Sequence, residues 1–235
     1  MIPLVVLSFI NSPAKATTAL GSCLESVLKS GCPRLACYGL LSTLTEALQV
    51  TSKRHPCMSI SNKLKGLEIL SPLMFKPALV AFTLSALQNT HLTRLSIMKI
   101  AFSPKQWATL LNQVTLSLLV SLELDQDCPT SELVSFLTHH QSITHLTFSC
   151  YSTPHRWIGS LCTSKPSIVL PNLTELAGSP ACLLPLLHQI SISTHFQNLT
   201  LHFDELNTNG SFFFSDILSC SDYIPSLPFL IVFLP

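Results

Sequence analysis

The chain has 235 residues, of which 47% are hydrophobic and only 11% are charged, so it has ample material for a core and a thinly charged surface. Lys and Arg total 13 against 12 Asp and Glu, and no basic run is long enough to follow a phosphate backbone, which argues against nucleic acid as a partner. No apolar stretch reaches the roughly 18 uninterrupted residues of a membrane-spanning helix, which argues against a membrane protein.

A short apolar motif, LxxLxL, recurs along the whole chain. Its central residues lie 23 to 31 residues apart, close to the period of about 20 to 29 residues in leucine-rich repeats. The residue after each centre is small or polar in every copy before the last, as expected for strands with one buried side and one solvent-facing side. The predicted central residues are Leu7, Tyr38, Leu67, Leu95, Leu122, Leu146, Leu176, Leu199 and Leu230.

The segments between these motifs have helical rather than alternating periodicity. The predicted helices 77–87 and 104–114 each begin with a proline, which the first helical turn tolerates well. A third helix, 131–139, follows Thr130, which is a predicted N-cap, and a fourth is expected over 182–190. A strand and a returning helix of this kind bury their apolar sides only by stacking on neighbouring copies.

The pattern therefore predicts an α/β leucine-rich-repeat solenoid, with short parallel strands on a concave face and helices on a convex face. We expect a single domain over residues 1–235 without polar terminal caps, which would be a fragment, the product of a truncated gene, or a solenoid that a partner closes. The concave face would be a protein-binding surface. The residues expected to contact a protein partner are Glu68, Arg94, Glu123, Asp125, His145 and Glu175.

Three phrases in the sequence, CPRLACYGL, SELVSFLTHHQSITHLTF and LPNLTELAGSP, resemble the leucine-rich-repeat region of fungal F-box-like proteins. The resemblance covers most of the chain. In such proteins the repeats recognise a target protein, and a separate N-terminal helical F-box docks onto the adaptor of a ubiquitin ligase. The resemblance therefore implies a protein-binding module that recognises substrates for ubiquitin ligation.

The nine cysteines are odd in number and form no CxxC pair, which favours reduced thiols in a cytoplasmic or nuclear protein. The alternative is a secreted, glycosylated leucine-rich-repeat protein that binds an extracellular ligand. Residues 1–16 place an apolar run before a small-residue site, as a signal peptide does, although no positive charge precedes the run. Sequons that would then be open to glycosylation begin at Asn172, Asn198 and Asn209.

No pattern typical of a catalytic, cofactor or metal site is found. The sequence contains no GxSxG, HExxH or phosphate-binding glycine loop, so we expect neither enzyme activity nor a cofactor or small-molecule substrate. His139, His140 and His145 lack the further pair of ligands that zinc needs. The carboxylates of the ELDQD segment are expected to form an acidic patch where a strand ends rather than a divalent-ion site.

The two tryptophans are the remaining candidates for binding anchors. Trp107 lies in a predicted helix and is expected in the core. Trp157 lies in a polar insert and is the better candidate for an exposed aromatic contact.

Overall fold

The computed structural model describes residues 4–10, 22–27, 29–40, 63–88, 91–125, 127–149, 168–192, 195–202 and 229–233. The chain divides into two compact units, Met1–Leu119 (unit 1) and Val120–Pro235 (unit 2). Each unit combines parallel strands in an open sheet with helices. The predicted α/β class with parallel strands is confirmed, whereas the single domain over the whole chain stays a prediction.

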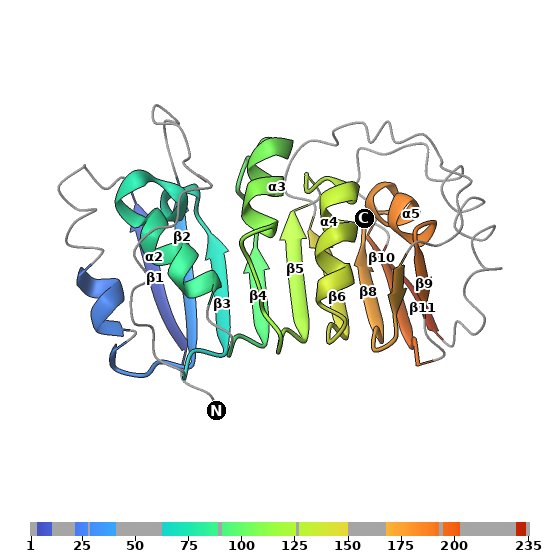
Figure 1. The fold of residues 1–235 in the computed structure, drawn as a ribbon, viewed down its shortest axis with the longest axis horizontal. Helices are drawn as coiled ribbons and strands as arrows, with labels where there is room; N and C mark the ends of the chain where they lie inside the picture. The colour runs from blue at the N-terminus through green and yellow to red at the C-terminus, as the bar shows by residue number, and fades with distance from the viewer. Residues whose placement is uncertain are drawn as a thin grey trace. The chain divides into compact units, whose positions relative to one another are not determined.

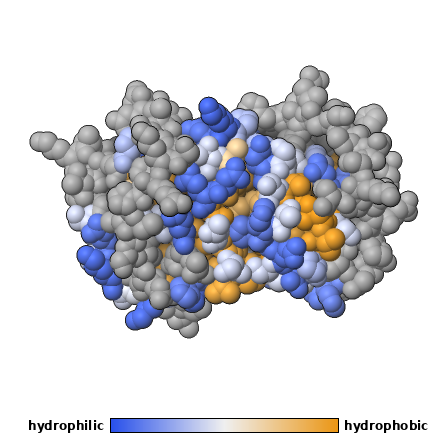
Figure 2. Space-filling model, in the orientation of Figure 1, coloured by the Kyte–Doolittle hydropathy of each residue, from blue (hydrophilic) through white to orange (hydrophobic). Residues whose placement is uncertain are grey.

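Unit 1 contains parallel strands that pair in chain order (Figure 1). They are β1 (Leu4–Ile10), β2 (Arg34–Leu40), β3 (Gly66–Leu70) and β4 (Arg94–Ile97). The 3-10 helix η1 (Pro72–Phe75) and α2 (Pro77–Leu87) follow β3, α3 (Pro104–Leu111) follows β4, and residues 22–27 are also helical. Hydrophilic residues cover the region of α3 in Figure 2.

Unit 2 also pairs its main strands in parallel, in the order β5 (Ser121–Asp125), β6 (His145–Ser149), β8 (Glu175–Gly178), β10 (Asn198–His202) and β11 (Phe229–Phe233). The helices α4 (Thr130–His139) and α5 (Pro180–Leu187) lie on one side of these strands (Figure 1). A separate two-stranded sheet pairs β7 (Ile168–Leu170) with β9 (Ile190–Ile192).

The register of the strands places the central leucines of the repeat motif side by side. In unit 1, Leu67 pairs with Leu95, and both are buried. A row of this kind gives each strand the same apolar contact with its neighbours, as in stacked repeats. The same position in unit 2 is occupied, strand after strand, by Leu122, Leu146, Leu176, Leu199 and Leu230.

The first two predicted copies of the motif are wrong in register. Leu67 pairs with Leu35 rather than with Tyr38, and Leu35 pairs with Val5 rather than with Leu7. The error is two residues at β1, which keeps the face, and three residues at β2, which moves a side chain to the opposite face. Leu35 is fully buried, whereas 36% of Tyr38 is exposed. The core therefore selects the register that buries Leu35.

The strands begin with a recurring backbone arrangement in which two consecutive N–H groups donate to a single carbonyl of the preceding repeat. In unit 1, Thr93 and Arg94 donate to the Lys65 carbonyl at 2.8 and 3.0 Å. In unit 2, Thr144 and His145 donate to the Val120 carbonyl at 2.8 and 3.1 Å. The copies thus repeat in backbone geometry as well as in sequence. The same double acceptor role belongs to the carbonyls of Pro33, Thr144 and Thr174.

The helices agree with the predicted segments except at their ends. Helix 77–87 is confirmed, and α3 ends earlier than predicted, at Leu111. Thr130 is the first residue of α4 rather than its N-cap. The helix predicted over 182–190 runs instead from Pro180 to Leu187, because Ile190 begins β9. None of the helices that the structure describes is both long and apolar enough to span a membrane.

Candidate functional site

Strands β5, β6, β8 and β10 of unit 2 present alternate side chains to opposite sides, as the strand pleat requires. Their leucines are buried, and most residues between the leucines are half-buried. These half-buried residues form two rows that cross the strands in register, which we call the unit 2 face. Its first row is Ser121, His145, Glu175 and Asn198, and its second row is Glu123, Thr147, Ala177 and Thr200.

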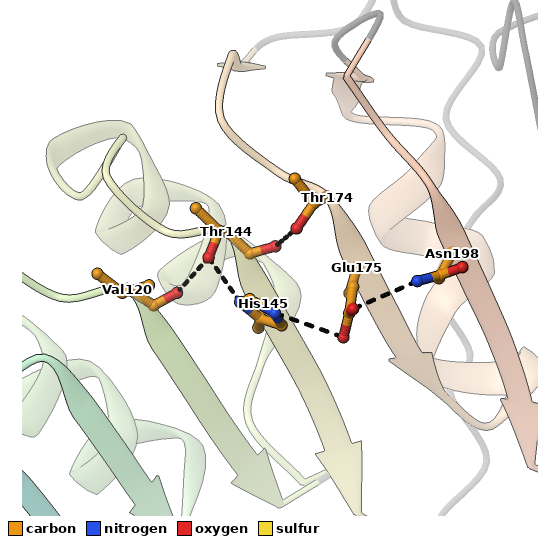
Figure 3. A network of polar contacts seen from close by, with 6 residues as sticks. All are labelled: Val120, Thr144, His145, Thr174, Glu175 and Asn198. Atoms are coloured by element: carbon orange, nitrogen blue, oxygen red, sulfur yellow. Dashed lines mark hydrogen bonds and ion pairs between the residues drawn. The ribbon is translucent and has the colours of Figure 1, made fainter.

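The first row is held together by contacts between neighbouring strands (Figure 3). His145 Nε2 lies 3.5 Å from Glu175 Oε2, and Asn198 Nδ2 donates to Glu175 Oε1 at 3.2 Å. Glu175 thus receives one contact from each side. The side chains of His145 and Glu175 are 46% and 47% exposed, so this carboxylate is oriented by its neighbours and still reaches the surface.

The loops before the strands add hydroxyl groups to this network. Thr144 Oγ1 lies 2.6 Å from His145 Nδ1 and 3.3 Å from the Val120 carbonyl, and Thr174 Oγ1 donates to the Thr144 carbonyl at 3.0 Å (Figure 3). With a neutral imidazole, Thr144 donates to Nδ1 and Nε2–H faces Glu175. With an imidazolium, Nδ1–H donates to Thr144, whose proton then goes to the Val120 carbonyl. Both protonation states of His145 fit the same positions.

Thr144, His145 and Glu175 follow the order hydroxyl, imidazole, carboxylate, which also occurs in acyl-transfer enzymes. Acyl transfer further requires N–H donors directed at the developing oxyanion. The backbone N–H groups of Thr144 and His145 donate instead to the Val120 carbonyl. The imidazole and the carboxylate are also close to half exposed, so the row is better suited to polar contacts than to chemistry that excludes water.

The two carboxylates of β5 that were predicted to contact a partner, Glu123 and Asp125, differ in accessibility. Glu123 is half-buried and accepts a hydrogen bond from Ser149 Oγ at 2.8 Å. Asp125, at the end of the same strand, is only 2% exposed, so it offers almost no surface to a partner. Within the described residues, no group of three or more His, Cys, Asp or Glu is placed to hold a metal ion.

Two of the predicted contact residues lie in unit 1. Arg94 is exposed at the start of β4, and Glu68 is mostly buried by an ion pair in which Arg34 Nη2 lies 3.1 Å from its Oε1. Gly66 lies between Arg34 and Arg94 in register. A Cβ at position 66 would meet Arg34 Cγ at 3.3 Å, so the glycine makes room for the arginine stem. Exposed Tyr38 lies on the same side of β2 as Arg34.

The other histidines considered as metal ligands are bound to their own helix. His139 Nδ1 contacts the Ser135 carbonyl at 2.9 Å, and His140 Nδ1 contacts the Phe136 carbonyl at 2.8 Å. His140 also stacks on the Phe136 ring, with 3.8 Å between ring centroids. Burial lowers the pKa of His140 and is the largest influence on it. The hydrogen bond with the Phe136 carbonyl raises that pKa by less, and the nearby His139 lowers it by less still. A neutral, packed imidazole fits this position.

Sequence reasoning identified His145 and Glu175 but missed Thr144, Tyr38 and Arg34. Thr144 precedes its strand and contributes through a contact that depends on register, and Tyr38 was assigned to the opposite face. Trp107 is fully buried, as predicted. Trp157 lies outside the described residues.

No family model matches the chain, and a comparison with curated proteins finds no match. The described residues define a class, an α/β protein with parallel strands and repeated strand geometry.

Proposed function

We propose that this chain is a non-enzymatic protein-binding module of the leucine-rich-repeat type, whose partner lies along the unit 2 face. The in-register leucines and the repeated pair of N–H donors support a repeat architecture. One observation carries the binding role: two rows of half-buried residues, most of them polar, cross four paired strands, and neighbouring side chains orient the carboxylate of Glu175.

The chemistry of the face fits a protein ligand. Neighbouring strands lie about 4.8 Å apart, so the rows present donors and acceptors at a regular spacing that a peptide segment can match. Because His145 and Asn198 already orient Glu175, little side-chain entropy is lost when a partner binds there. Glu123 and Glu175 favour a partner segment that offers Lys, Arg or backbone N–H donors.

The resemblance to the repeats of fungal F-box-like proteins suggests a cellular role for this binding, the selection of substrates for ubiquitin ligation in the cytoplasm or nucleus. The full-length transcript tests that role: coding sequence for an F-box joined to this frame, together with binding of the ligase adaptor by the encoded protein, is the expected result. An encoded protein that does not bind the adaptor contradicts the ligase role but leaves protein binding by the face open.

The binding proposal is tested with matched variants of one purified chain. A partner is captured with the wild-type chain, purified, and titrated by calorimetry against wild type, Glu175→Lys and Thr138→Lys. Glu175→Lys reverses the charge at the centre of the first row, and Thr138→Lys adds the same lysine on the exposed side of α4. We expect the Kd to rise about tenfold or more, about 1.4 kcal/mol, only for Glu175→Lys. Equal affinity for all three chains would refute the proposal.

A further inference from the structure

Charge is divided unequally between the two units. Residues 1–119 hold 11 of the 13 Lys and Arg and three of the 12 Asp and Glu, a net charge of +8. Residues 120–235 hold the other two basic and nine acidic residues, a net charge of −7. The described part of unit 2 contains five carboxylates and neither Lys nor Arg. The near-zero net charge of the whole chain is therefore the sum of two units with opposite net charge. Unit 1 of one molecule attracts unit 2 of another.

The basic residues of unit 1 gather where its strands begin. Arg34 and Arg94 flank Gly66 in register at the first residues of three paired strands. Lys63 and Lys65 lie just before Gly66, and both are exposed. Arg34 is paired with Glu68, and these four basic residues still leave an excess of positive charge where the strands begin.

Each strand order ends in a strand with one paired neighbour among the described residues. β1 pairs with β2 and β11 pairs with β10, and neither has a second strand partner among the described residues. An end strand directs backbone N–H and C=O groups away from its single neighbour. Natural edge strands often carry a charged residue, especially Lys, or a proline, and these residues prevent pairing with another strand. The two end strands here, LVVLSFI and FLIVF, contain none of these.

We propose that a second copy of this chain docks head to tail, with β1 of cationic unit 1 in one copy against β11 of anionic unit 2 in the next. Pairing β1 with β1 would bring together two units of charge +8, and pairing β11 with β11 two units of −7, so charge selects the head-to-tail contact. Such a heterologous interface leaves one end strand open on each side and continues to further copies or closes as a ring. The inference concerns the ends of the strand orders and stands without the proposed function.

The salt dependence of self-association tests the proposal. Sedimentation of the purified chain is measured over a dilution series at about 0.01 M and about 1 M ionic strength, where the Debye lengths are about 30 and 3 Å. We expect species heavier than the 25.8 kDa monomer at low salt and association weakened about tenfold or more at high salt. A monomer at every concentration, or association that salt leaves unchanged or strengthens, overturns the proposal.

At each of two positions, a pair of variants with opposite charges provides the matched control. Val6 on β1 is 53% exposed, and Thr200 on β10 occupies the equivalent position, one residue after the aligned centre. Val6→Glu and Thr200→Lys should each weaken association about tenfold, whereas Val6→Lys and Thr200→Glu should not. Mixing Val6→Glu with Thr200→Lys should restore a complex. If Glu and Lys have equal effects on association at both positions, the proposal is overturned. If both Val6 variants lose the circular dichroism signal of the folded chain, the comparison of Thr200→Lys with Thr200→Glu tests the proposal instead.

Discussion

Replacing Trp107 with phenylalanine should leave the stability of the chain almost unchanged, whereas alanine should lower it strongly. Trp107 is fully buried and packs edge-on against Phe102, with 5.2 Å between ring centroids, and Phe102 packs in turn against Phe75 at 4.7 Å. Its Nε1–H finds no acceptor among the described residues. A buried, unsatisfied donor costs about 1–3 kcal/mol, so the indole lowers stability through its N–H while it raises stability through packing.

The two substitutions separate these effects. Alanine removes the whole ring system and should cost about 3–5 kcal/mol. Phenylalanine removes two buried carbons, a loss of about 1.6 kcal/mol at about 0.8 kcal/mol each, and it also removes the unsatisfied N–H. The net change in unfolding free energy should stay within about 1 kcal/mol. Urea unfolding followed by circular dichroism measures the unfolding free energy of the alanine and phenylalanine variants. Phenylalanine and alanine variants that are equally destabilised would refute the reasoning.

Three further measurements test the core and its buried polar groups. Leu146→Ala, at a fully buried motif centre, should lower the unfolding free energy by about 2–5 kcal/mol. Val169→Ala, at a side chain that is 59% exposed, should change it by no more than about 0.5 kcal/mol. If urea unfolding gave both variants a similar loss of stability, the burial of the motif centre would be contradicted. Burial raises the pKa of Cys37 to about 12, so iodoacetamide at about pH 8.5 should modify exposed Cys23 much faster than Cys37, and equal rates by peptide mass spectrometry would speak against this. Burial holds the pKa of His140 below its ordinary value, so as pH falls this side chain is protonated in the unfolded chain before it is protonated in the folded chain. The unfolding free energy should therefore fall as pH drops below about 6.5. His140→Phe should flatten that part of the pH profile, and an unchanged profile would count against a neutral imidazole.

The sequence predicted the parts of the fold that side-chain type decides. Leucine at a fixed position of each motif is apolar and must be buried, so the centres at Leu122 and Leu146 could be assigned without a structure. At β2 the phrase CPRLACYGL fits the motif in two registers, one centred on Leu35 and one on Tyr38. Only pairing with Leu67 selects Leu35. The three-residue strands β7 and β9 are too short to show a periodicity.

The candidate site was predictable as a face but not as a network. Alternation along the strand placed His145 and Glu175 on the solvent side. Their contact joins residues 30 positions apart, and that of Glu175 with Asn198 joins residues 23 apart, so both depend on a register that composition does not fix. Asp125 was expected on the same face but is buried. Its carbonyl accepts a hydrogen bond from Cys128 N–H at 3.2 Å, a contact with the following segment that alternation along the strand does not predict.

Site-specific photocrosslinking tests the central claim, that a protein partner lies along the unit 2 face. A photoreactive phenylalanine analogue replaces Thr147, in the second row of that face, or Thr138, on the exposed side of α4. Both chains are irradiated with the purified partner, and the adducts are identified by mass spectrometry. We predict partner adducts from position 147 and none from position 138. Adducts from position 138 alone would contradict binding along the strands.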